Sequence, residues 1–301
     1  MNSRNVLIIG AGPAGVTAAL QLKRYGIEAV LVEKEEIGGL LRNANLVENY
    51  PGFPDGIGGS ELVELFKRQL KNAGVKVCFE EVKELEYADG RFRAKTTERL
   101  ITSDIVVIAS GTKPRAISDM KISEDVEDRI FYAISPIRSV GDKKIAIIGA
   151  GDAAFDFALG LSRRNEVTIL NRSNRAKCVP VLWERCVESG NVFYVDKAHV
   201  EKIRSDGEEI VLTYAHDGDR RKKEVRADYV VVAIGREPCL DFLGNRLKRR
   251  IDALADSSGI YMVGDVGNDI YRHVAICVGD GLRAAMRIRS CVAGEGNEDS
   301  G

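Results

Sequence analysis

The sequence lacks three features that would assign it to a narrow class at once. It has no Cys-x-x-Cys pair, so neither a zinc site nor a local dithiol motif is present among its six cysteines, at positions 78, 178, 186, 239, 277 and 291. The first apolar run, Val6–Ile9, is too short for a signal peptide or a membrane span, so we expect a cytoplasmic protein without a membrane partner. The 44 basic and 45 acidic side chains leave a net charge of −1, which gives no reason to expect a nucleic acid as partner.

The length of 301 residues is about twice that of a common domain, which predicts two domains. The last eight residues, 294–301, combine glycine with acidic and polar side chains, and we expect them to form a frayed tail. Three histidines are present, of which His199 and His216 are expected at the surface.

A motif near the N-terminus returns in the middle of the chain. Residues 6–12 read Val-Leu-Ile-Ile-Gly-Ala-Gly, and residues 145–151 read Ile-Ala-Ile-Ile-Gly-Ala-Gly. A second pair of similar segments, 105–111 and 229–235, each has a β-branched run that ends in glycine. This repetition indicates that one structural unit is used twice.

The repeated segments have the pattern of parallel sheets. Continuous β-branched runs of four to six residues are typical of strands that are covered on both faces by helices. A helix after Gly10 and a strand at 29–33 complete a βαβ unit, and a helix around 156–162 with a strand at 167–170 repeats it. Short strands with charged turns within 78–108 and 192–232 predict antiparallel hairpins, and a final helix is expected from about 274 to 291.

These patterns predict an α/β fold class with two three-layer, Rossmann-like dinucleotide-binding domains, the second inserted into the first. No third repeat follows residue 238. The first domain is therefore expected to be discontinuous, with residues 1–116 and 238–301, and the second to span residues 117–237.

The first glycine motif is suited to a dinucleotide. Residues 10–15, Gly-Ala-Gly-Pro-Ala-Gly, follow a strand and open a helix, so the backbone can approach a pyrophosphate at the helix N-terminus. Glu33 ends the next strand 23 residues after Gly10, where a carboxylate can bind ribose hydroxyls. A glycine turn that binds nothing is the alternative, which the register of strand, helix and acid disfavours.

The second glycine motif, residues 149–154, has no acid at the end of the following strand. Asn171 and Arg172 stand there instead, with Arg175 and Lys177 just beyond. These cations favour a 2′-phosphate, and therefore NADP(H) over NAD(H), unless they are solvated surface charges.

Together these motifs resemble the thioredoxin-reductase group of pyridine nucleotide-disulfide oxidoreductases over nearly all of residues 5–292. The resemblance also rests on six further segments, at 38–41, 47–54, 109–115, 233–238, 264–266 and 271–274. It implies FAD in the discontinuous domain, a nicotinamide cofactor in the inserted domain, and a homodimer.

The resemblance also implies the residues that bind each cofactor. Asn49 would lie by the flavin ring, Asp265 would bind the ribitol chain, and the backbone at His273 would face the pyrimidine end of the flavin. No side chain is implied as a catalytic acid, base or nucleophile. The FAD residues implied are Gly10, Gly12, Pro13, Ala14, Gly15, Glu33, Lys34, Gly39, Leu40, Asn49, Gly111, Gly264, Asp265, Arg272, His273 and Val274. The NAD(P)H residues implied are Gly149, Gly151, Asp152, Ala153, Arg172, Lys177 and Gly235.

The chain departs from that family at the redox centre. Without gaps from Gly149, the family's Cys-x-x-Cys-Asp falls on residues 132–136, which read Tyr-Ala-Ile-Ser-Pro. Neither Tyr132 nor Ser135 can replace a thiolate. The two cysteines that lie nearest to each other in the sequence, Cys178 and Cys186, are eight positions apart.

A second resemblance, to a group of reductases without the disulfide, agrees with the absence of the Cys-x-x-Cys pair. Residues 132–144 and 152–159 are similar to ferredoxin/flavodoxin-NADP reductases, which also lack it. The C-terminal extension of those reductases does not fit in the 36 residues after Asp265, most of which are expected to form the final helix and the tail. Residues 271–274 also match the sequence of the thioredoxin reductases rather than theirs. The 2′-phosphate pattern of both relatives, His-Arg-Arg followed by Arg, is here Asn171-Arg172-Ser173 with Lys177.

The sequence therefore predicts an FAD-dependent NAD(P)H oxidoreductase, with NADPH as the cofactor and NADH as the alternative. Its electron acceptor would be external, such as ferredoxin, flavodoxin or a small oxidant. Two other hypotheses remain open: a disulfide reductase that uses non-standard cysteines, and a catalytically silent FAD-binding protein that does not use NADPH.

Overall fold

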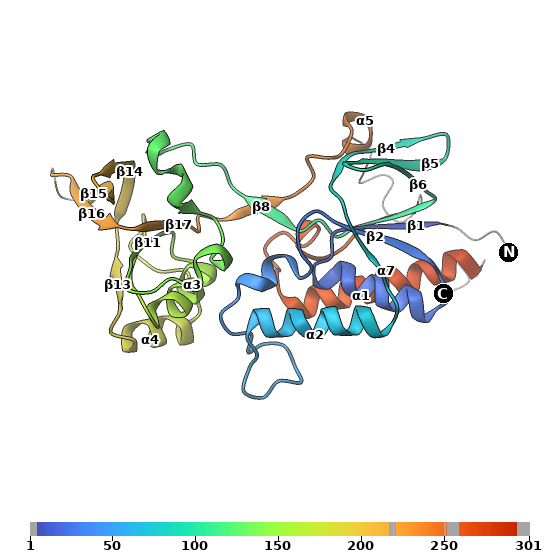
Figure 1. The fold of residues 1–301 in the computed structure, drawn as a ribbon, viewed down its shortest axis with the longest axis horizontal. Coiled ribbons are helices and arrows are strands. Elements are labelled where there is room, and N and C mark those ends of the chain that lie inside the picture. The colour runs from blue at the N-terminus through green and yellow to red at the C-terminus, as the bar shows by residue number, and fades with distance from the viewer. Residues whose placement is uncertain (1–4, 217–218, 220, 250, 252–258, 294–301) are drawn as a thin grey trace. The chain divides into compact units, whose positions relative to one another are not determined.

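The computed structural model describes residues 5–216, 219, 221–249, 251 and 259–293, so the tail expected at 294–301 lies outside the described residues. The chain divides into two compact units (Figure 1). Unit 1 contains the described residues up to Arg42, then Glu48–Lys113, and those from Glu237 onward. Unit 2 contains Asn43–Val47 and Pro114–Arg236.

Unit 1 is built on a parallel five-stranded sheet, ordered β19-β7-β1-β2-β3. Its strands are β1 (Val6–Ile9), β2 (Ala29–Glu33), β3 (Val77–Phe79), β7 (Ile105–Ile108) and β19 (Ile260–Met262). An antiparallel sheet consists of β4 (Val82–Ala88), β5 (Arg91–Thr96) and β6 (Leu100–Ser103). The helices are α1 (Pro13–Arg24), α2 (Gly59–Asn72), α5 (Asn245–Lys248) and α7 (Val274–Ala293), with 3₁₀ turns η1 (Gly39–Asn43) and η4 (Gly264–Val266).

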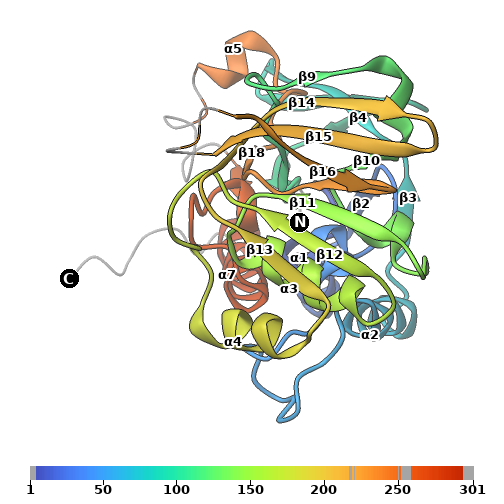
Figure 2. The ribbon, with the colours of Figure 1, turned by 90° about the vertical axis from the view of Figure 1, so that its left-hand side faces the viewer.

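Unit 2 repeats this plan with a parallel sheet ordered β10-β17-β11-β12-β13. Figure 2 labels four of its strands, β10, β11, β12 and β13. Its strands are β10 (Ile130–Phe131), β11 (Lys144–Ile148), β12 (Glu166–Leu170), β13 (Val192–Val195) and β17 (Tyr229–Val232). The second sheet contains β9 (Lys121–Ile122), β14 (Ala198–Asp206), β15 (Glu209–His216) and β16 (Lys223–Ala227). The helices are α3 (Asp152–Ser162) and α4 (Pro180–Glu188), with η2 (Glu124–Arg129) and η3 (Ser135–Ile137). A separate two-stranded sheet of β8 (Thr112–Pro114) and β18 (Arg236–Pro238) lies where the chain passes from one unit to the other.

The register of the strands shows which residues of the two units occupy equivalent positions. Ile9 pairs with Val32 in unit 1, and Ile148 pairs with Leu170 in unit 2. The next residues, Glu33 and Asn171, are therefore structurally equivalent. The parallel sheets and the α/β class agree with the sequence prediction, and the edge strand β19 is supplied by the last part of the chain.

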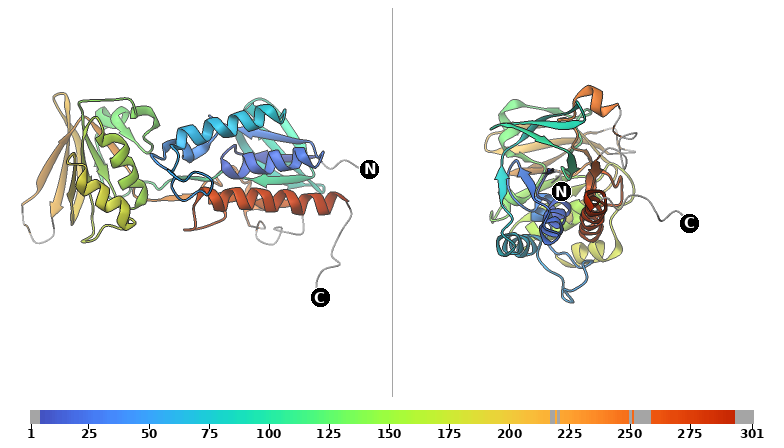
Figure 3. Two further views of the ribbon diagram at one scale, coloured as in Figure 1. Left: turned by 90° about the horizontal axis from the view of Figure 1, so that it is seen from below. Right: turned by 90° about the vertical axis from the view of Figure 1, so that its right-hand side faces the viewer.

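The layers differ from the expectation in one respect. Helices cover one face of each parallel sheet, as α1, α2 and α7 do in unit 1 (Figure 3), and the antiparallel sheet packs on the other face. The prediction of helices on both faces was wrong. A continuous apolar run in a strand shows that both faces of the strand are buried, but it does not show whether a helix or a second sheet buries them.

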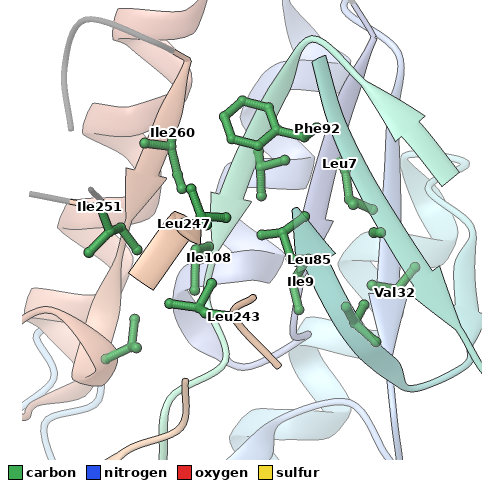
Figure 4. Close-up of a cluster of buried hydrophobic side chains, with 14 residues drawn as sticks. Leu7, Ile9, Val32, Leu85, Phe92, Ile108, Leu243, Leu247, Ile251 and Ile260 are labelled. Atoms are coloured by element: carbon green, nitrogen blue, oxygen red, sulfur yellow. The ribbon is translucent and has the colours of Figure 1, made fainter. Parts of the chain in front are cut away.

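The core between the two sheets of unit 1 follows the alternation of side chains along a strand. Leu7 and Ile9 of β1 point into it, where they meet Leu85 and Phe92, which are both 0% exposed (Figure 4). Complete burial of each such side chain stabilises the fold by about 1.5–3 kcal/mol. This core holds the carboxyl ends of β1 and β2 in place, and the first glycine motif begins there.

Candidate functional site

The loop between β1 and α1 is a tight turn that requires glycine. Gly10 has φ +101°, and a Cβ atom there would lie 2.4 Å from the carbonyl oxygen of Ala109. Helix α1 begins at Pro13 with Gly12 as its N-cap, and no side chain caps its first turn, which includes Ala14 and Gly15. The uncapped N–H groups suit the oxygens of a pyrophosphate.

Glu33 closes this loop from the end of β2. It is 9% exposed; its Oε2 accepts a hydrogen bond from Ala11 N at 2.8 Å, and its Oε1 accepts one from Glu35 N at 3.0 Å. A buried carboxylate beside a pyrophosphate turn suits the ribose of a dinucleotide. Lys34, by contrast, is exposed and pairs with Glu35 at 3.4 Å.

The segment after β2 folds back onto the glycine turn. Gly38 N donates to Ala11 O at 2.8 Å, and a Cβ on Gly39 would lie 3.6 Å from Gly12 Cα. Leu40 follows in η1 and is half-buried. Gly39 therefore lies beside the glycine turn, and the role of Gly39 and Leu40 in binding FAD stays a prediction.

A second loop of unit 1, η4, approaches the start of α1. Gly264 lies so close to Ala14 that a Cβ there would be 2.9 Å from the Ala14 side chain. The next residue, Asp265, accepts a hydrogen bond from the Cys277 thiol at 3.2 Å. Burial and this carboxylate raise the pKa of Cys277, so its thiol remains a neutral donor.

Asp280, a residue that no sequence motif marks, fixes the same loop. Its Oδ2 accepts hydrogen bonds from Gly264 N and from Asn268 Nδ2. A charged residue inside a predicted helix gave no signal of this role, because its partners are 12 and 16 positions away.

Asn49 and His273 come together although 224 positions separate them. Asn49 Nδ2 lies 2.9 Å from His273 Nδ1. If the amide donates, the neutral imidazole carries its proton on Nε2. Both residues are exposed; Arg272 and Val274 beside His273 are half-buried, and Gly111 lies at the turn after β7, where its carbonyl accepts a hydrogen bond from Cys239 N at 3.0 Å.

The loop between β11 and α3 repeats the first glycine turn. Gly149 has φ +118°, and a Cβ atom there would lie 2.2 Å from the carbonyl oxygen of Ala233. Helix α3 begins at Asp152, with Gly151 as its N-cap and Ala153 in its first turn, and no side chain caps its N-terminus. Asp152 instead uses Oδ1 to accept a hydrogen bond from Val179 N at 2.8 Å.

Asn171 takes the position that Glu33 has in unit 1. It is 4% exposed, and its amide donates to the carbonyl of Arg175 at 2.9 Å and to the hydroxyl of Tyr194 at 2.7 Å. Its Oδ1 accepts a hydrogen bond from Ser173 N at 3.1 Å. The amide is therefore committed to the protein, and the sequence gave no signal for Tyr194.

Three cations lie on the loop that Asn171 organises. Arg172, Arg175 and Lys177 are all exposed, and no Asp or Glu within the described part of the chain pairs with them. The backbone of Lys177 donates to Ala150 O at 2.8 Å, which places this residue beside the glycine turn. Gly235 follows β17, and its carbonyl accepts from Arg115 N at 3.1 Å.

Residues 132–136 carry no sulfur and form a fixed turn. The side-chain oxygen of Asn43 accepts hydrogen bonds from Ile134 N at 3.1 Å and from Ser135 N at 3.0 Å. Asn43 is 5% exposed, and Ile134 is 1% exposed. Tyr132 is partly exposed, and burial together with Glu127 raises the pKa of its phenol, which therefore stays protonated at neutral pH.

The six cysteines are all free thiols. Burial raises the pKa of Cys186 to about 12, and the thiol lies 3.7 Å from the carbonyl of Phe155. Burial and Asp152 also raise the pKa of Cys178. A raised thiol pKa lowers the fraction of thiolate, so both residues are poorly suited to attack a disulfide.

Two negative findings apply to the described residues. They contain no group of three or more His, Cys, Asp or Glu side chains that could hold a metal ion. Among their helices, none has the length and apolar character needed to cross a membrane.

Comparison with known proteins is consistent with this geometry. Residues 4–281 match the model of the family described as pyridine nucleotide-disulphide oxidoreductase. The chain is 26% identical over 306 residues to the thioredoxin reductase of Chlamydia trachomatis, with 95% of this chain and 97% of that relative covered. The thioredoxin reductase structures of Lactococcus lactis and T. acidophilum match with TM-scores of 0.86 and 0.84 and identities of 25% and 27%, covering 97% and 96% of this chain and 99% of each structure. The chain therefore belongs to the pyridine nucleotide-disulphide oxidoreductase family and has the thioredoxin-reductase fold.

Proposed function

We propose that this protein is an FAD-dependent NAD(P)H oxidoreductase that passes electrons to an external acceptor such as ferredoxin or flavodoxin, without an internal disulfide. One observation carries the proposal. Both glycine turns are present, at residues 10–15 and 149–154, yet Tyr132 and Ser135 stand where the resemblance would require a dithiol relay.

Unit 1 has the donor set that suits FAD. The uncapped start of α1 would bind the diphosphate, Glu33 the adenosine ribose, and Asp265 the ribitol chain. Asn49 and His273, joined by their 2.9 Å contact, would lie at the flavin ring. The chemistry of these groups suits the cofactor, because the carboxylates would face the sugars while backbone N–H groups would face the phosphates.

Unit 2 has the complementary set for a nicotinamide nucleotide. The start of α3 would bind the diphosphate, and the cations at Arg172 and Lys177 would bind a 2′-phosphate. Asn171 presents no carboxylate that would repel this phosphate. We therefore favour NADPH over NADH.

When bound, FAD supplies the redox chemistry by taking a hydride from the nicotinamide and releasing electrons to an acceptor. The protein's own residues would bind and orient the two cofactors, and neither the Tyr132 phenol nor the Ser135 hydroxyl can form a disulfide that would relay electrons. The acceptor must therefore approach from outside. By its resemblance, we also propose that the protein acts as a homodimer.

Anaerobic titration of the purified yellow protein with NADPH, and separately with NADH, tests the proposal. NADPH is expected to bleach the flavin absorbance, and ferredoxin, flavodoxin or a dye is expected to restore it. A flavin that neither nucleotide reduces would contradict the proposal and favour a silent FAD-binding protein. A colourless protein that FAD does not reconstitute would contradict both.

The cysteine-dependent alternative has a separate test. The Cys178→Ser and Cys186→Ser double variant should keep its NADPH-dependent dye reduction, because neither thiol is expected to carry electrons. Burial raises the pKa of Cys186 to about 12, so little of this thiol is ionised at pH 8, and iodoacetamide should label it slowly in the folded protein. Loss of turnover with a disulfide substrate in the double variant would instead support the alternative.

A further inference from the structure

Tyr194 lies on the strand next to the cationic loop, and aromatic neighbours fix its ring. It belongs to β13, where its register partner in β12 is Ile169, two residues before Asn171. Trp183 of α4 packs edge-on against the ring with centroids 4.9 Å apart, and Phe155 lies 6.1 Å away. This packing directs the phenol toward the carboxyl end of β12.

The phenol meets an amide whose hydrogen-bonding groups are all used. One amide hydrogen of Asn171 goes to Tyr194 Oη and the other to the carbonyl of Arg175, while Oδ1 accepts from Ser173 N. Ser173 Oγ lies 3.0 Å from the same Oδ1 and 3.1 Å from the Arg175 carbonyl, so it braces the turn from inside. Residues 171–175 are therefore held in one shape.

The brace explains how the cations are presented. Because Asn171 and Ser173 point into the turn, Arg172 and Arg175 remain exposed, and the Lys177 backbone is fixed to Ala150 O. A flexible loop would have to order its cations when the anion binds, at the cost of side-chain and backbone entropy. A loop that is already ordered avoids this cost.

We propose that Tyr194 is a positioning residue for the nicotinamide nucleotide: through Asn171 it holds the 171–175 turn so that Arg172 and Lys177 meet a 2′-phosphate. The inference rests on the proposed function, which it extends from the cations to the side chains that orient them. Tyr194 touches no part of the nucleotide. Its effect is confined to nucleotides that carry the 2′-phosphate.

The Tyr194→Phe variant tests the inference because it removes only the hydroxyl and keeps the aromatic packing. We expect the KM for NADPH to rise about fivefold, with kcat nearly unchanged, since the loss of one hydrogen bond loosens the turn. The KM for NADH is expected to change less than twofold. A merely structural role would raise both values together.

A binding measurement makes the test independent of turnover. Calorimetry with adenosine 2′,5′-bisphosphate, compared with ADP, should show a loss of affinity of about fivefold in the variant for the first ligand only. Tyr229→Phe is the matched control, because it removes a phenol hydroxyl from β17 of the same sheet, away from the 171–175 turn, and should change neither affinity. Equal affinities in wild type and Tyr194→Phe would overturn the inference. If wild-type flavin is not reduced by either nucleotide, the proposed function fails, and the ligand comparison still decides the role of Tyr194.

Discussion

Glu33 and Asn171 end equivalent strands, but only Glu33 offers a charge, and the Glu33→Gln variant tests what that charge does. The carboxylate accepts hydrogen bonds from Ala11 N and Glu35 N, and an amide can replace only one of these acceptors. We expect Glu33→Gln to weaken FAD binding about tenfold and to lower the unfolding free energy by about 1–3 kcal/mol. Flavin absorbance per chain after dialysis measures the first effect. Glu28→Gln, at an exposed carboxylate that pairs with Lys23, should retain full flavin, and equal retention in both variants would contradict the prediction.

The reverse exchange at position 171 tests the nucleotide preference. An Asn171→Asp substitution brings a negative charge beside the proposed 2′-phosphate and removes the donors to Arg175 O and Tyr194 Oη. The kcat/KM for NADPH should fall by about tenfold or more, while that for NADH falls much less. Steady-state kinetics with both nucleotides checks this ratio. A parallel decline for the two nucleotides would show that the substitution only damages the fold.

At the scale of elements, helix α7 packs directly on α1. A Cβ atom on Gly281 would lie 2.2 Å from the carbonyl oxygen of Ala14, whereas one on Gly279, in the same helix, would meet nothing within 4 Å. We therefore expect Gly281→Ala to lower the unfolding free energy by about 1–3 kcal/mol, since the helices must separate. Gly279→Ala should instead stabilise the helix by about 0.5–1 kcal/mol. Urea denaturation of the two variants provides the comparison, and equal midpoints would refute the close packing.

The sequence predicts the fold best where the signal is local. The strand at 29–33 and the final helix from Val274 follow from residue pattern alone, and the structure confirms both. The antiparallel layer over each parallel sheet was not anticipated as a cover, because apolar strands do not reveal what buries them. Tyr194 and Asn43 were missed because their partners are 23 and 91 positions away, and no spacing rule connects such residues.

At the scale of the whole molecule, unit 2 includes a short segment from the N-terminal third of the chain. Residues 43–47 group with unit 2, although the residues on either side belong to unit 1. Asn43 supplies the acceptor for Ile134 N and Ser135 N, and the backbone N of Asn45 donates to Asp156 of α3 at 2.8 Å. Unit 2 is therefore completed by a segment that lies about 70 residues before its main part begins.

Asn43→Ala tests whether this segment stabilises unit 2. Two N–H groups would lose their acceptor in a buried turn, which should lower the unfolding free energy by about 2–4 kcal/mol and speed hydrogen exchange at Ile134 and Ser135. Asn43→Asp keeps the oxygen acceptors and should restore most of the protection. Asn45→Ala is the matched control, because its bond to Asp156 uses the backbone and survives the substitution. If exchange at Ile134 is as slow in Asn43→Ala as in Asn45→Ala, the turn at residues 132–136 is held by its own packing, and residues 43–47 do not stabilise it.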